Sequence, residues 1–143
     1  MSVLDVTITT SRPAAEVLRI LTDFEGRRSA AWRGIDDKHF AVHDVGDDWA
    51  DVTEGNAFAW ERERYQWDAA RGTVSVTTTD SNLWGPGSGW EYQLTPTQDG
   101  SELHVRAIRN PKNLRGRIVV LLLRPFGKKL TARNFSHVLA AAA

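Results

Sequence analysis

Alternating apolar and polar residues predict seven β-strands in this chain. In residues 3–10, Leu4, Val6 and Ile8 fall on one face of a strand. Six further segments show the same alternation or are rich in β-branched residues, and short turns with Gly, Asp or Pro separate them. Short turns between strands favour an antiparallel sheet. The six segments are residues 40–45, 49–54, 58–67, 73–79, 90–95 and 103–107.

Two helical regions interrupt and end this series of strands. After the first strand, Ser11 can cap a helix whose first turn holds Pro13, and a short helix or turn follows over residues 27–32. Near the end, Asn110 can cap a long helix with Pro111 at its first position, and Pro125 predicts a kink within it. The apolar stripe of this long helix is Leu114, Ile118, Leu121, Leu122, Leu130 and Val138.

This order of elements predicts an α+β fold in which a curved seven-stranded antiparallel sheet wraps around the long C-terminal helix. The apolar stripe has to lie on the concave face of the sheet. One helix cannot fill that hollow, so we expect a ligand-sized apolar cavity between helix and sheet. The length of 143 residues suits a single domain.

Composition excludes several classes of function. The chain has no cysteine, so disulfides and thiol chemistry are excluded. Its longest purely apolar run, residues 118–123, is far below the roughly 20 residues of a membrane span. The first ten residues alternate in polarity and do not resemble a secretory signal, so the expected location is the cytoplasm.

Charge is divided unevenly along the chain although the net charge is zero. Residues 1–70 carry 14 acidic and 8 basic side chains, residues 71–143 carry 4 and 10, and no carboxylate side chain follows Glu102. The favoured interpretation is that a basic helix offsets acidic loops of the same fold. Attraction of residues 115–129 to a membrane is the less favoured one. Nucleic acid is not expected as a partner, because the basic residues are not interleaved with aromatic ones.

Several segments resemble the START-like superfamily, also called SRPBCC or polyketide cyclase/dehydrase-like helix-grip proteins. The resemblance rests on Ser-Arg-Pro-Ala-Ala-Glu-Val at residues 11–17, on Trp32, and on residues 60–68 followed by Asp-Ser-Asn at 80–82. Gly116-Arg117 and Gly127 in the last helix also contribute. The resemblance covers residues 1–143 as one domain. It implies a deep apolar cavity for lipids, polyketides or hormones, in proteins of which some are enzymes and many only bind.

Apolar and aromatic side chains are the candidates for lining that cavity. Alternation places Trp90 and Tyr92 on one face with Leu94, and Trp84 lies in a glycine-rich loop that can cover the cavity mouth. His39 and His43 lie on a predicted strand, where four residues span about 13 Å. No metal and no cofactor are therefore expected. The full set of expected ligand-binding residues is Trp32, Phe40, Val42, Trp60, Val76, Trp84, Trp90, Tyr92, Val105, Leu122, Phe126 and Leu130.

The strand at residues 58–67 has a charged pattern that leaves three alternatives open. Arg62 and Arg64 share one face, whereas Glu61 and Glu63 share the other. An inward arginine could hold a ligand oxygen. An inward glutamate could act as a base, and a bent strand would keep all four charges on the surface. The weak catalytic candidates are Arg62, Arg64, Tyr92 and His104.

The sequence thus predicts binding of a small hydrophobic ligand, by a monomer or homodimer. A polyketide cyclase or dehydratase-type enzyme is the first alternative. The second is a protein-interaction module with a vestigial pocket. Two titratable groups that converge inside the fold would favour catalysis, and a wholly apolar lining would favour binding.

Overall fold

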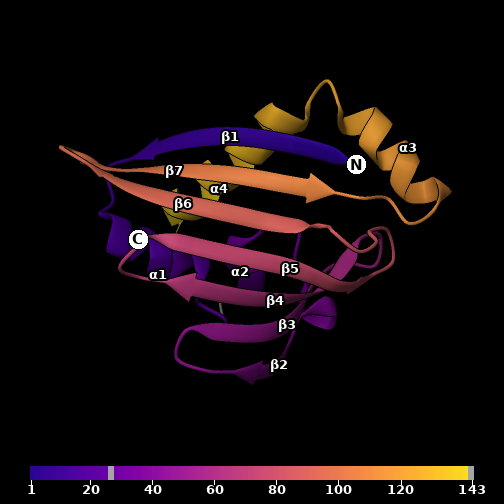
Figure 1. Cartoon of the computed structure of the whole chain (residues 1–143), viewed down its shortest axis with the longest axis horizontal. Coiled ribbons are helices and arrows are strands. Elements are labelled where there is room, and N and C mark those ends of the chain that lie inside the picture. The colour runs from indigo at the N-terminus through magenta and orange to yellow at the C-terminus, as the bar shows by residue number, and fades with distance from the viewer. Residues whose placement is uncertain (26–27, 142–143) are drawn as a thin grey trace.

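A computed structural model describes residues 1–25 and 28–141. Its centre is a seven-stranded antiparallel sheet with the strand order β1-β7-β6-β5-β4-β3-β2 (Figure 1). The predicted order of strands is confirmed, and each boundary lies within a few residues of the expected one. The strands are β1 (Ser2–Thr10), β2 (Ala41–Val45), β3 (Trp49–Gly55), β4 (Trp60–Asp68), β5 (Thr73–Ser81), β6 (Gly89–Thr97) and β7 (Gly100–Arg109).

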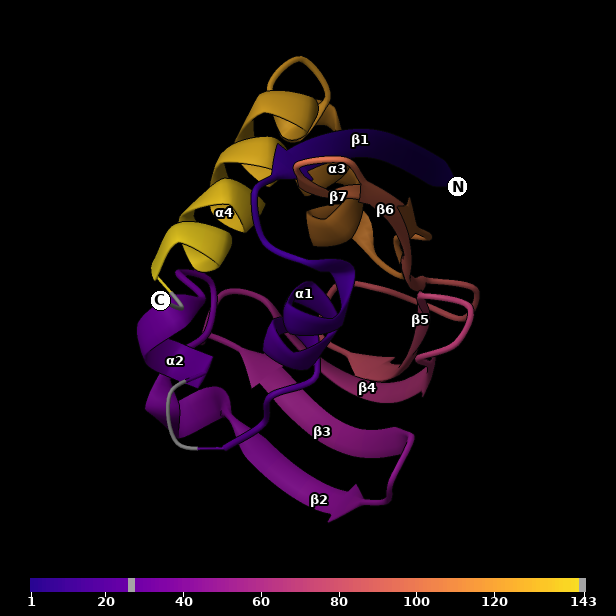
Figure 2. The ribbon, with the colours of Figure 1, turned by 90° about the vertical axis from the view of Figure 1, so that its left-hand side faces the viewer.

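The helices α1, α2 and α4 lie on one side of the curved sheet, as Figure 2 shows. This arrangement is the predicted helix-grip architecture, with α4 as the long C-terminal helix. Residue 27, the first of the predicted second helix, lies outside the described residues. The helices are α1 (Ala14–Leu21), α2 (Arg28–Ala31), the short 3-10 helix η1 (Asp37–His39), α3 (Leu114–Leu123) and α4 (Gly127–Ala141).

The core lies between the concave face of the sheet and these helices. Val17 and Leu21 of α1 are buried there, and Phe135 and Leu139 of α4 belong to the same cluster. The side chain of Arg12 donates to the carbonyl oxygen of Leu139 at 2.6 Å, which joins the end of α4 to the start of α1. The chain thereby closes the concave face with segments that are far apart in sequence.

Both predicted helix caps are wrong. Pro13, not Ser11, occupies the N-cap position of α1, and no side chain caps that end. The last helical region begins three residues later than expected, where the side chain of Asn113 accepts a hydrogen bond from the Gly116 N–H at 2.9 Å. Asn110 is engaged elsewhere, because its side chain donates to the carbonyl oxygen of Pro86 at 2.8 Å.

Pro125 ends a helix instead of bending one. A proline lacks the N–H donor, and its ring opposes the carbonyl four residues earlier. The chain therefore leaves α3 after Leu123, turns through Pro125 and begins α4 at Gly127. In Figure 1, α3 lies at one end of the sheet, whereas α4 passes behind it.

The predicted apolar stripe is divided between two environments. Val138 of α4 is buried, as expected. The other five residues face solvent; four of them lie on α3, which projects beyond the end of the sheet and has no concave surface to cover, and Leu130 lies in the first turn of α4. These exposed residues are Leu114, Ile118, Leu121, Leu122 and Leu130.

Candidate functional site

Charged side chains of β4 point into the fold. Glu61, Glu63 and Tyr65 face the concave side, and Glu63 and Tyr65 are each 3% exposed. Across the strand pair, Glu54 of β3 lies opposite Glu61. Of the three alternatives for this strand, the structure therefore has the inward glutamates. Three carboxyl groups thus lie on the concave side, where buried charges have to be balanced.

Arg28 balances the first of these carboxyl groups. Its guanidinium forms a buried ion pair with Glu54 and donates to the hydroxyl oxygen of Tyr65 at 2.9 Å. That hydroxyl donates in turn to Glu54 at 2.9 Å. Burial lowers the pKa of Arg28, but the charge and hydrogen bond of Glu54 together with the nearby Tyr65 and Tyr92 more than offset this, and the pKa rises overall. The three side chains are joined in a closed triangle of hydrogen bonds.

Arg109 balances the second carboxyl group at the end of β7. Its guanidinium binds Glu61 at 2.7 Å, and Thr78 donates to the same carboxylate oxygen at 2.9 Å. The guanidinium carbon also lies 4.5 Å from the ring centre of Trp90 and 5.1 Å from that of Trp84. Arg109 is therefore held by one charge and two aromatic rings.

Among residues 1–25 and 28–141, none forms an ion pair with Glu63. Burial raises the pKa of Glu63 well above its usual range, and the charges of Glu61 and Glu54 raise it further, while Arg109 opposes them. The neutral acid form is favoured as a result. Arg28 and Arg109 are therefore paired with Glu54 and Glu61, whereas the burial of Glu63 favours its neutral form.

Aromatic rings occupy the space between α4 and the sheet. The ring centre of Phe135 lies 5.2 Å from Trp32, 5.6 Å from Tyr92 and 6.2 Å from Trp90. The expectation that helix side chains leave this hollow open is corrected here, because Phe135 reaches the sheet residues. Burial raises the pKa of Tyr92 well above its usual range, and nearby Glu63 and Glu54 add to this shift.

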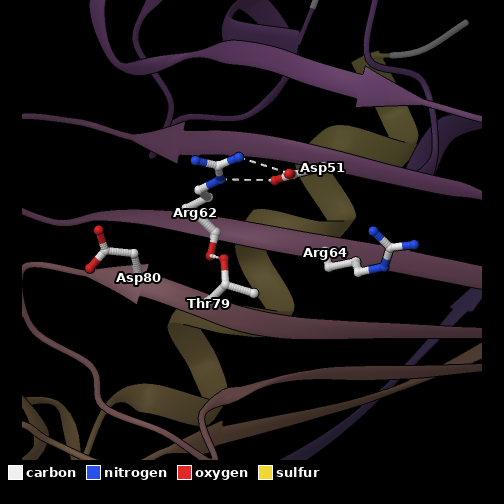
Figure 3. A pocket seen from close by; sticks show the side chains of 5 residues that line it. All are labelled: Asp51, Arg62, Arg64, Thr79 and Asp80. Atoms are coloured by element: carbon white, nitrogen blue, oxygen red, sulfur yellow. Dashed lines mark hydrogen bonds and ion pairs between the residues drawn. The ribbon is translucent and has the colours of Figure 1, made fainter.

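Arg62 and Arg64 lie on the opposite, outer face of the sheet. They line a shallow surface hollow of about 440 Å³ together with Asp51, Thr79 and Asp80 (Figure 3). Arg62 binds Asp51 through two hydrogen bonds of 2.9 and 3.1 Å. Arg64 stacks 4.6 Å above the ring of Trp49. Strand alternation sends these side chains away from the interior, so the prediction that they act there is wrong.

His104 also faces outward. It pairs with Asp5 at 3.1 Å and lines a second hollow on the outer face. Its alternation partners Leu103 and Val105 take the inward positions of β7, which leaves His104 in solvent. Of the four catalytic candidates, Tyr92 is the one that lies inside the fold.

The predicted ligand-binding residues fall into two groups. Most surround the interior: Trp32, Phe40, Val76, Trp84, Trp90, Tyr92 and Val105 are buried or packed against the core. Trp60 is half-buried at the start of β4, on the outward alternation shared with Arg62. Four residues are exposed and cannot line the interior in this structure: Val42 on the edge strand β2, and Leu122, Phe126 and Leu130 in the α3–α4 region.

The sequence interpretation missed Arg28, Glu54, Arg109 and Phe135. For two of them, the alternation of the strand indicated an inward position. Glu54 follows the inward residues Ala50 and Val52 at the period of a strand. Arg109 extends the inward row of β7 in the same way. Arg28 lies on a four-residue helix, which has no periodicity to interpret.

The buried polar side chains on the concave side form hydrogen bonds with one another. Within the described part of the chain, every buried side-chain nitrogen and oxygen has a hydrogen-bond partner. Among those same residues, no three His, Asp or Glu side chains come together as a metal site would need. What the arrangement offers chemically is a proton on Glu63, fixed charges beside it and a layer of aromatic rings.

No protein-family model matches the sequence, and no curated protein matches it either. Solved structures do resemble it. The Zhui aromatase/cyclase from Streptomyces sp. R1128 has a TM-score of 0.81 at 14% identity, over 99% of this chain and 93% of its own. For Ara h 8.0201 the TM-score is 0.66 at 12% identity, over 98% and 96%. For a START superfamily protein from Mycobacterium smegmatis it is 0.63 at 12%, over 92% and 96%. At these identities the likeness concerns the fold, and we conclude that this chain has the helix-grip fold of START superfamily proteins.

Proposed function

We propose that this protein binds a small hydrophobic molecule between the sheet and α4. The observation that carries the proposal is the combination of an aromatic layer with buried polar side chains beside it, since Arg28 lies 5.2 Å from the ring centre of Trp32 and Arg109 lies 4.5 Å from that of Trp90. An apolar site with a few fixed polar groups is the usual composition of a ligand pocket. The helix-grip fold supports the proposal because its concave face is closed by helices instead of by a second sheet.

The polar end of the ligand would face Arg109 and Glu63. Arg109 holds its charge beside Trp84 and Trp90 and is partly accessible. Glu63 in its neutral form can donate a hydrogen bond, so a carbonyl or phenol oxygen suits this position. The apolar part would take the place where Phe135 meets Trp90 and Tyr92, and these rings would have to move apart on binding.

Indole N–H signals offer a direct test of this location. We expect the aromatic probe 1-anilinonaphthalene-8-sulfonate to shift the signals of Trp90, Trp84 and Trp32 in a nitrogen–proton correlation spectrum. The indole of Trp49 lies on the outer face beneath Arg64 and is the internal control. Shifts confined to the backbone amide signals of α3 would show that the probe binds the exposed apolar surface of that helix, and would contradict the proposal.

A second candidate function is acid–base catalysis on such a ligand. The observation that favours it is that Glu63 and Tyr92 are both buried on the concave side and both have raised pKa values, the charge of Glu63 being one cause of the shift at Tyr92. A neutral carboxylic acid close to a phenol can protonate an oxygen and stabilise an enolate during ring closure. An enzyme of the cyclase kind would use that chemistry.

Turnover of a linear poly-β-ketone, followed by aromatic absorbance, tests the second candidate. If Glu63 transfers a proton, Glu63→Gln should lower the rate by about a hundredfold or more while probe affinity is kept. Tyr92→Phe is the matching variant for the phenol. A rate equal to that of the unchanged protein in both variants would leave binding as the function.

The raised pKa of Glu63 also predicts how stability depends on pH. Below pH 4.5, the ordinary pKa of a glutamate side chain, Glu63 is protonated in both the folded and the unfolded chain. Above it, only the folded chain keeps the proton, so the free energy of unfolding should fall by about 1.4 kcal/mol per pH unit until the folded pKa is passed. Glu63→Gln should lack this decline in urea unfolding measured across pH.

The exposed Glu102 provides the matched control. Glu102→Gln changes the same chemical group on the outer face of β7 and should keep the pH dependence of the unchanged protein. If the free energy of unfolding falls equally with pH in Glu63→Gln and in the unchanged protein, Glu63 is ionised in the folded chain and the prediction is wrong.

A further inference from the structure

Most apolar side chains of the helix α3 are exposed, and only Val119 and Val120 among them are half-buried. Of its ten residues, all of which the structure describes, Gly116 alone is buried. The side chains of Leu121, Leu122 and Phe126 are 64%, 67% and 63% exposed. We call the exposed apolar side chains of α3 and the segment after it the α3 patch: Leu114, Ile118, Leu121, Leu122, Leu123, Phe126 and Leu130.

The position of the α3 patch is fixed by the first turn of the helix. Asn113 caps the helix and also donates to the carbonyl oxygen of Asn82 at 2.9 Å. Gly116 packs so closely that a Cβ there would lie 2.5 Å from the carbonyl oxygen of Leu83. The apolar residues therefore project from a firmly held base. A helix that is apolar all round is normally buried in a core or in a membrane.

The α3 patch is surrounded by positive charge. Five exposed basic side chains interleave with it: Arg115, Arg117, Arg124, Lys128 and Lys129. No carboxylate side chain follows Glu102 in the sequence, so none occurs in α3 or α4. Apolar side chains within a ring of cations are complementary to a lipid surface that carries anionic headgroups.

We propose that the α3 patch docks on an anionic lipid surface. The leucine and phenylalanine side chains enter the headgroup boundary, and the basic side chains contact lipid phosphates. A helix of ten residues is about 15 Å long, which suits insertion parallel to the surface. Among the described residues, none of the helices has the length and hydropathy to cross a bilayer.

A second copy of the chain suits the α3 patch less well. In a two-fold symmetric dimer the same surface meets itself, so five cationic side chains of one protomer would face the same five of its partner. Like charges brought together in this way oppose association. An anionic lipid surface removes the repulsion and covers the apolar side chains as well.

Vesicle co-sedimentation of the full chain tests the proposal. We expect binding to vesicles of phosphatidylcholine mixed with phosphatidylserine, weak binding to phosphatidylcholine alone, and loss of binding as salt is raised. The double variant Arg124→Gln/Lys129→Gln should weaken binding roughly fivefold for each charge removed. Lys38→Gln/Arg71→Gln removes two exposed cations outside the patch and should have little effect.

The apolar part is tested separately. Leu121→Ser/Leu122→Ser should reduce vesicle binding by about tenfold or more. Because both side chains are exposed, the thermal unfolding of this variant should match that of the unchanged protein. The control Val42→Ser/Val45→Ser alters exposed apolar residues on β2, at the far edge of the sheet.

Three outcomes would overturn the proposal. One is equal binding to neutral and anionic vesicles, and another is no binding to either. The third is a concentration-dependent dimer that Leu121→Ser/Leu122→Ser disperses, which would identify a second copy as the occupant. None of these measurements depends on the interior site, so lipid docking and interior ligand binding can fail independently.

Discussion

Replacing Arg28 with methionine should lower the free energy of unfolding by about 3–5 kcal/mol, because it leaves the Glu54 carboxylate buried without its cation. The guanidinium also lies 4.5 Å from the ring centre of Phe24 and donates to the carbonyl oxygen of Asp23 at 3.0 Å. Methionine keeps the apolar contact but supplies no donor. Urea unfolding, followed by tryptophan fluorescence, measures the difference.

Two further variants identify the buried charge as the cause. Arg62→Met breaks the exposed pair with Asp51 on the outer face and should leave the free energy of unfolding nearly unchanged. Arg28→Met/Glu54→Gln removes both charges of the buried pair and should recover part of the loss. If Arg62→Met lowers the free energy of unfolding as much as Arg28→Met does, the effect of losing an ion pair does not depend on its burial, and the prediction is wrong.

Replacing Phe135 with alanine should cost about 3–5 kcal/mol and open a cavity among three aromatic rings. The ring of Phe135 meets Trp32 edge-on with planes at 90°, and it contacts Tyr92 and Trp90 on the sheet. Because these three rings are held by other elements of the fold, they cannot move far enough to fill the space that Phe135 leaves. A dry cavity lined by such groups takes up small apolar molecules.

Benzene reports on that cavity. It should raise the thermal unfolding midpoint of Phe135→Ala and leave that of the unchanged protein nearly constant, because a ligand that binds only the folded state stabilises it. Phe126→Ala makes the same substitution at an exposed position and should change the free energy of unfolding by less than about 0.5 kcal/mol. An unaltered midpoint for Phe135→Ala in benzene would mean that the neighbouring rings close the space.

Much of the fold was predictable because period-two alternation records which side of a strand is buried. In β7, Leu103, Val105 and Ala107 alternate with His104 and Arg106, and the structure buries the first set. The same alternation in β4 predicted two opposite faces but could not say which is concave, because charged residues occupy both. That choice depends on the neighbouring residues, since Glu61 binds Arg109 and Thr78 inside the fold, whereas Arg62 binds Asp51 on the outer face.

The candidate site was less predictable than the fold. Tyr92 and Trp90 were placed correctly because they follow the alternation of β6. The interior cation Arg28 was missed, since its role depends on Glu54, which is 26 residues away along the chain. The apolar stripe of α3 was expected to be buried and is exposed. A sequence shows that one face of a helix is apolar, but not which part of the structure covers that face.

The sequence alone determined the order of the strands and the antiparallel sheet, because both depend on local periodicity. At Pro125 it predicted a kink from the missing N–H of proline, and the structure has a break between two helices there. Tertiary structure decided which face of β4 carries charge inward, which carboxyl group keeps its proton, and which side of α3 meets solvent. These features depend on the distances between residues remote in sequence, and burial and Coulomb interactions act through such distances.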